Sequence, residues 1–225
     1  MNEFELIRRC FRDRAIQRPG TVLGIGDDSA LLDTGGAPPV HARATVAFST
    51  HDDAAGTARC VFGAAFVRLA ARAVTPRWTT LGLTFEPGDP DWIESFAAAA
   101  AAVCDACAVE LVGGDTTRGP GRATVFALGA MSAPTRRSTP APPAGTVTAR
   151  LPLATADRIA NLVSVCTDLA ARGADIRCDV PPAASEDTRA GIMELVAHTD
   201  AAGMDALRAV AGRPSAGTDR TESNV

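Results

Sequence analysis

The chain has 225 residues, 46% of them hydrophobic, which is enough to bury a sizeable core in one large domain or in a domain with an appendage. Its net charge of −4 at pH 7, with no stripe of basic residues, argues against a nucleic-acid partner, because phosphate backbones are bound by clustered cations. No apolar run reaches the roughly 20 residues that a membrane span needs, which argues against a membrane partner.

The N-terminal part of the chain predicts helices that alternate with strands. Residues 1–14 space Phe4, Ile7 and Phe11 as an amphipathic helix and not as the apolar core of a signal peptide, so we expect a cytoplasmic protein. The other predicted elements are a short buried strand at residues 21–25, strands at 44–50, 81–85, 111–112 and 124–128, and helices at 54–73 and 90–109.

This order of elements predicts an α/β fold in which helices pack on one face of a mixed or antiparallel sheet. A segment rich in Pro, Thr, Ser and Ala then predicts a linker, followed by a reduced C-terminal α/β domain. In that domain we expect helices at residues 157–172, 188–198 and 200–210 and a strand at 176–180. The predicted boundaries are an N-terminal domain over residues 1–132, a linker over 133–150, a C-terminal domain over 151–211 and a disordered tail over 212–225.

Two adjacent carboxylates, Asp27 and Asp28, follow the first predicted strand within the sequence Gly-Ile-Gly-Asp-Asp-Ser-Ala. Glycines let a phosphate approach the backbone, and Mg²⁺ prefers carboxylate oxygens that it can bridge to phosphates. A double Asp in a turn is also a common solvated turn former. The motif therefore allows a magnesium site or a plain turn.

A second motif, Gly113 to Pro120, is predicted as a loop after the strand at residues 111–112. Asp115 offers a carboxylate for a metal, Gly114 offers backbone, Thr116 and Thr117 offer hydroxyls, and Arg118 offers a guanidinium for phosphate oxygens. As an isolated turn it too has a purely structural interpretation. Two such strand-end loops in one α/β domain favour a nucleotide site.

These motifs resemble the signature loops of the thiamine-monophosphate kinase family. The resemblance rests on GIGDDSALL at residues 24–32 and LVGGDTTRGP at 111–120, with support from NEFELI, VAFST and TPRWTTL, and it covers about the first 130 residues in order. It implies the fold of the aminoimidazole ribonucleotide synthetase-like superfamily, a homodimer formed by the N-terminal domain, and transfer of a phosphoryl group from ATP to thiamine monophosphate with the help of Mg²⁺.

The resemblance also implies roles for individual residues. Asp27, Asp28 and Asp115 match metal-binding carboxylates of the family, and Thr116 and Thr117 would lie close to the phosphates of ATP. The family has Asp-Thr after the Ser-Thr of its second strand, where this chain has His51, so Asp52 is a candidate replacement for the missing carboxylate. An acidic position of the family's Asn-Leu-Ser-Asp motif aligns with Arg68, which would repel Mg²⁺ if it faced the site.

The substrate segment Val-Glu-Gly-x-His-Phe and two C-terminal motifs of the family are absent from the chain. Two hypotheses therefore stand. The first is an ATP- and Mg²⁺-dependent kinase that acts on thiamine monophosphate or a related small phosphate ester. The second is a catalytically degenerate relative that serves as a nucleotide-binding or dimeric partner protein.

The six cysteines predict no zinc site, and the three histidines give no catalytic set. Cys104 and Cys107 form a CxxC pair inside a predicted alanine-rich helix, which favours buried thiols over a redox or zinc pair. His51 beside Asp52 is either a metal ligand or part of a polar cluster at a strand end.

Overall fold

The computed structural model describes residues 3–26, 29–86, 90–131, 145–179 and 192–211. The chain starts with a helical segment in which α1 (Glu3–Leu6) continues through a π-helical turn into a 3-10 turn that ends at Arg14. The remaining elements are β1 (Thr21–Leu23), β2 (Leu31–Leu32), β3 (Pro39–Ala47), α2 (Ala54–Ala70), β4 (Trp78–Phe85), α3 (Pro90–Ala106), β5 (Glu110–Arg118), β6 (Arg122–Ala130), β7 (Gly145–Pro152), α4 (Ala156–Ala171), β8 (Asp175–Asp179), β9 (Ile192–Thr199) and α6 (Ala201–Ala211).

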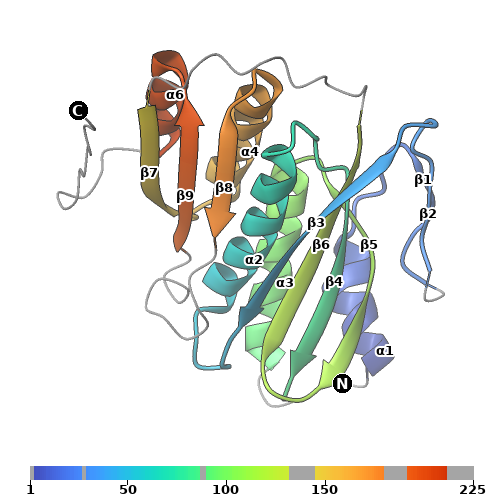
Figure 1. Cartoon of the computed structure of the whole chain (residues 1–225). Helices are drawn as coiled ribbons and strands as arrows, with labels where there is room; N and C mark the ends of the chain where they lie inside the picture. The colour runs from blue at the N-terminus through green and yellow to red at the C-terminus, as the bar shows by residue number, and fades with distance from the viewer. Residues whose placement is uncertain (1–2, 27–28, 87–89, 132–144, 180–191, 212–225) are drawn as a thin grey trace.

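The N-terminal half is built on a four-stranded sheet with the order β3-β6-β4-β5. β4 and β5 run parallel, while the other neighbours are antiparallel. Helices α2 and α3 cover one face of this sheet (Figure 1). Leu81, Leu83 and Phe85 of β4 are buried on that face, as their alternation predicts. The predicted α/β fold, with helices on one face of a mixed sheet, is confirmed.

Helix α2 lies at the centre of the molecule. It packs against β3, β6 and α3 of the N-terminal half and also against α4 and β8 of the C-terminal half. Its residues are apolar on all sides, which is typical of a helix that is buried on all sides. In the described ranges, no helix is long and apolar enough to cross a membrane.

The C-terminal half contains an antiparallel three-stranded sheet, β7-β9-β8, with α4 and α6 packed beside it. The helix predicted at residues 188–198 is wrong, because the described part of that segment is the central strand β9. Met193, Leu195 and Ala197 are buried at every second position, and this period of two outweighs their helix propensity. β7 begins at Gly145, inside the predicted linker.

The strand predicted at residues 21–25 is not buried. β1 pairs only with β2, in a two-stranded hairpin apart from the main sheet. The side chain of Val22 is 62% exposed, because two strands alone cannot cover both of their own faces. β3 also starts earlier than predicted and ends at Ala47, so residues 48–50 already belong to the following loop.

Leu69 and Leu31 offer a matched test of this core. Leu69 of α2 is completely buried, whereas Leu31 of β2 is 58% exposed. We expect Leu69→Ala to lower the free energy of unfolding by about 2–5 kcal/mol. Leu31→Ala should cost less than about 1 kcal/mol because it removes little buried surface. Urea denaturation followed by circular dichroism measures both, and equal losses would contradict the central position of α2.

Candidate functional site

Strand β5 carries a β-bulge near its start. Thr79 of β4 pairs with Leu111, but Thr80 pairs with Gly113, so Val112 is left out of the register and its side chain is buried. An extra residue reverses the faces of all residues that follow it, because successive side chains of a strand point to opposite faces. Without the bulge, Asp115 would face the helices. With it, Asp115 lies on the open face of the sheet and is exposed.

The second sequence motif is therefore part of a strand. Residues 113–118 continue β5 in register with β4, so the predicted loop is wrong up to Arg118. Asp115 and Thr117 share the open face, where the Thr117 hydroxyl lies 2.9 Å from the Thr84 hydroxyl. Thr116 and Arg118 point to the other face. The four predicted ligands are neighbours in the chain, but they divide between two faces of an edge strand.

Gly114 is required by the sheet itself. A Cβ atom at this position would lie 2.0 Å from the carbonyl oxygen of Leu81 in β4, whereas a Cβ at Gly113 would meet nothing within 4 Å. The backbone of Gly114 thus approaches β4, and this close approach accounts for the glycine without any ligand.

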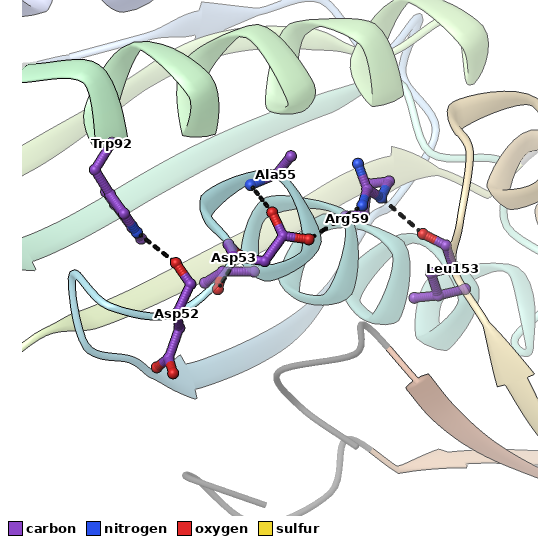
Figure 2. Close-up of polar contacts among 7 residues, drawn as sticks. Asp52, Asp53, Ala55, Arg59, Trp92 and Leu153 are labelled. Atoms are coloured by element: carbon purple, nitrogen blue, oxygen red, sulfur yellow. Dashed lines mark hydrogen bonds and ion pairs between the residues drawn. The ribbon is translucent and has the colours of Figure 1, made fainter. Parts of the chain in front are cut away.

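The loop between β3 and α2 holds the candidate Asp52 (Figure 2). The Asp52 carboxylate accepts a hydrogen bond from the backbone N–H of Ser49 at 2.7 Å, and its own N–H donates to the Ser49 carbonyl at 2.9 Å. The carbonyl of Asp52 accepts from Nε1 of Trp92 at 3.0 Å. His51 is exposed on the same loop. The Asp52 carboxylate therefore folds back on its own turn and stabilises it.

Asp53 begins helix α2 and links it to the second half of the chain. Its carboxylate caps the helix by accepting from the backbone N–H of Ala55 at 3.0 Å. Its other oxygen lies 3.6 Å from a guanidinium nitrogen of Arg59, and Nε of Arg59 donates to the carbonyl of Leu153 at 2.9 Å (Figure 2). The candidate loop is thus connected to the C-terminal half through one side chain.

Asp27 and Asp28 lie outside the described residues, but the segment that leads to them is held by a buried carboxylate. Glu110, at the start of β5, is 5% exposed and accepts from the backbone N–H of Arg18 and from the Thr21 hydroxyl, both at 2.7 Å. Nε1 of Trp78 donates to the same hydroxyl at 3.0 Å. Sequence reasoning missed Glu110, whose only signal is a charge at the start of an apolar strand.

These two segments lie at opposite ends of the four-stranded sheet. The β3–α2 loop follows Ala47, which pairs with Arg122 at the end of the sheet where β4 and β5 finish. Thr21 contacts Trp78 and Glu110, where β4 and β5 begin. Eight steps of about 3.3 Å separate the ends of β5 by about 26 Å. Asp115 lies between these two ends.

Arg68 does not hold its guanidinium free to face a metal. Its Nε donates to the carbonyl of Cys178 at 3.0 Å, one terminal nitrogen donates to the carbonyl of Arg43 at 2.7 Å, and the other lies 3.7 Å from the Asp179 carboxylate. All three nitrogens thus have oxygen partners on β3 and β8. Arg68, which we expected to repel Mg²⁺ if it faced the site, instead joins the two sheets.

The cysteines are free thiols buried in the described structure, apart from the half-buried Cys107. Burial raises the pKa of Cys104, and it raises the pKa of Cys107 to about 12. Such thiols are protonated at neutral pH and are weak nucleophiles and weak metal ligands. In the described part of the chain, no three His, Cys, Asp or Glu side chains are close enough to hold a metal ion.

The described oxygen donors fit Mg²⁺ by their chemistry, because hard cations take carboxylate ligands. Asp115 is exposed on the open face, and Asp52 is bonded to Ser49. Of the four predicted magnesium ligands, these two are described, and the other two are Asp27 and Asp28. If Mg²⁺ binds here, it would neutralise phosphate charge beside Asp115.

The N-terminal part of the chain is similar to a known family of domains. Residues 26–132 match the family model "AIR synthase related protein, N-terminal domain", so this part of the chain is similar to such domains. Over 129 residues the chain is 37% identical to the thiamine-monophosphate kinase of Escherichia coli, a match that covers 52% of this chain and 38% of that protein. It is 32% identical over 140 residues to the Haemophilus influenzae enzyme, covering 57% of the chain and 41% of the relative.

A solved structure extends this similarity beyond the N-terminal part. The crystal structure of thiamine-monophosphate kinase from Stenotrophomonas maltophilia superposes with a TM-score of 0.62 and 25% identity, covering 94% of this chain and 90% of that one. The resemblance to thiamine-monophosphate kinases is therefore confirmed. The sequence matches span about two fifths of the length of the curated relatives.

The two neighbouring glycines of β5 give a matched test of the site's geometry. Gly114→Ala should lower the free energy of unfolding by about 1–3 kcal/mol or more, because the new methyl group would collide with the Leu81 carbonyl. Gly113→Ala should change it by less than about 1 kcal/mol, since open space surrounds that position. Thermal melting compares the two. If both variants melt alike, the close approach of β4 and β5 is wrong.

Proposed function

We propose that the protein is a kinase of the thiamine-monophosphate kinase type, which transfers a phosphoryl group from ATP to thiamine monophosphate or to a related small phosphate ester with the help of Mg²⁺. One observation carries the proposal: the bulge of β5 turns Asp115 out of the core, beside Thr117, in a domain whose curated relatives are thiamine-monophosphate kinases.

In phosphoryl transfer the protein mainly positions the reactants and neutralises the charge of the phosphates. No protein nucleophile is therefore needed. In the proposed site Asp27, Asp28 and Asp115 bind Mg²⁺, with Asp52 as a further candidate ligand. Thr117 donates to phosphate from the open face. Thr116, Arg118 and the backbone of Gly114 reach the nucleotide only around the free edge of β5, because their side chains or backbone lie toward the other face or toward β4.

A specific observation favours a second candidate function, that of a degenerate relative that binds nucleotide without turnover. Arg68 stands where the resemblance places a metal-binding acid, and its three nitrogens are engaged by the Cys178 and Arg43 carbonyls and the Asp179 carboxylate. Calorimetric titration with ATP, with and without Mg²⁺, followed by an assay for thiamine diphosphate, separates the two. Product formation supports the kinase, and metal-dependent binding without product supports the degenerate relative.

Asp115→Asn tests the metal ligand. Removal of one negative charge leaves the bridged phosphates less neutralised, so the Kd for Mg·ATP should rise at least roughly tenfold. Asp205→Asn on α6 is the control, because it removes the same charge from a side chain that is 80% exposed and distant in the fold. Calorimetry measures both variants. An unchanged Kd in Asp115→Asn would remove this residue from the site.

The open face of the N-terminal sheet supports a proposed homodimer. Phe126 is 36% exposed there, among the threonine hydroxyls of Thr45, Thr124 and Thr84. β4 has a neighbour on each side, so we place the proposed contact on the open face and not on the edge of this strand. We expect light scattering at micromolar concentration to give twice the mass of one chain, and Phe126→Asp to give a monomer. A monomeric unaltered protein would contradict the proposal.

A further inference from the structure

One indole ring touches both ends of the loop that joins β3 to α2. The ring of Trp92, on α3, stacks on Phe48 with centroids 4.5 Å apart and planes 15° apart. Its Nε1 donates to the carbonyl of Asp52 at 3.0 Å (Figure 2). Phe48 and Asp52 enclose Ser49, Thr50 and His51, so a residue from another helix closes this loop at both of its ends.

The ring itself is held firmly. Trp92 is only 6% exposed and also stacks on Phe96, with centroids 5.4 Å apart. Phe48 is fixed in turn, because its N–H donates to the carbonyl of Gly121 at 3.0 Å and a Cβ at Gly121 would lie 2.2 Å from the Phe48 carbonyl oxygen. The loop is therefore attached to a packed aromatic stack and not only to its own turn.

A buried indole N–H needs an acceptor, and in this fold the acceptor is a backbone carbonyl of the loop. The bond fixes the backbone at Asp52, and the Asp52 side chain then closes the turn through Ser49. This arrangement determines where the His51 and Asp52 side chains stand at the end of the sheet where β5 finishes.

We propose that Trp92 is a positioning residue, which holds the His51–Asp52 turn in place for the bound Mg·ATP. The proposal rests on the proposed function for its ligand, but the tether between Trp92 and the loop is testable without any ligand. Packing alone would require the aromatic ring and not its N–H group.

Hydrogen exchange, measured by mass spectrometry, tests the tether. Trp92→Phe keeps an aromatic ring but loses the donor, so amide exchange in residues 49–53 should accelerate roughly five- to tenfold, the effect of losing one hydrogen bond. Trp78→Phe is the matched control, because it also removes an indole N–H bond, here to the Thr21 hydroxyl, from another segment. It should accelerate exchange near residues 18–24 and leave residues 49–53 unchanged.

Fluorine NMR of the unaltered protein, labelled with 5-fluorotryptophan, tests the positioning role. The chain has two tryptophans, so two resonances are expected, and the two Phe variants assign them. A non-hydrolysable Mg·ATP analogue should shift the Trp92 resonance. The Kd of the Mg·ATP analogue for Trp92→Phe should be roughly five- to tenfold higher than for the unaltered protein. The circular dichroism spectrum of the variant should stay native.

Three results would overturn the proposal. They are unchanged exchange in residues 49–53 of Trp92→Phe, acceleration spread evenly over the whole chain, and a Trp92 resonance that stays in place while calorimetry records bound nucleotide. If calorimetry records no nucleotide binding to the unaltered protein, the proposed function fails, and the exchange comparison alone decides whether Trp92 holds the loop.

Discussion

The burial of helix α2 on all of its sides is the constraint on which the rest of the structure depends. Its residues form part of one hydrophobic core with both sheets, so neither half of the chain can be removed without exposing it. The few polar groups of the helix are placed where they organise other elements. Asp53 caps its start, Arg59 reaches the carbonyl of Leu153, and Arg68 joins β3 to β8. The candidate loop therefore takes its position from a helix that cannot move independently of either sheet.

The sequence pattern predicted those elements whose formation depends on burial along a single helix or strand. The alternation of Leu81, Leu83 and Phe85 gave β4, and the apolar run after Asp53 gave α2, because both depend on burial along one element. β9 was missed because Met193 and Leu195 favour helices, although their spacing of two was visible in the sequence. The geometry of the candidate site could not be predicted from the sequence. The skipped Val112 depends on the backbone of β4, and the bond from Trp92 to Asp52 joins residues 40 positions apart. No motif encodes contacts of that range.

The site residues show the same division between chemistry and geometry. The residue types suited to a metal and to phosphate were visible in the sequence, and the bulge does place Asp115 and Thr117 on one open face. The sequence did not indicate that Thr116 and Arg118 point the other way, or that Gly114 is already required by Leu81. A nucleotide bound at this edge strand would therefore meet hydroxyls and charges from two directions. This is a geometric condition that any account of its binding has to satisfy.

The burial of the cysteines makes them natural markers of how the core opens. Burial raises the pKa of Cys60 to about 11 and those of Cys166 and Cys178 to about 12, so the folded protein presents almost no thiolate to an alkylating reagent. Cys60 lies on the central helix, Cys166 on α4 and Cys178 on β8. Modification of each thiol then reports the opening of its own element, and the order in which they react traces which half of the molecule loosens first. The buried cysteines are therefore natural probes of local unfolding in both halves of the chain.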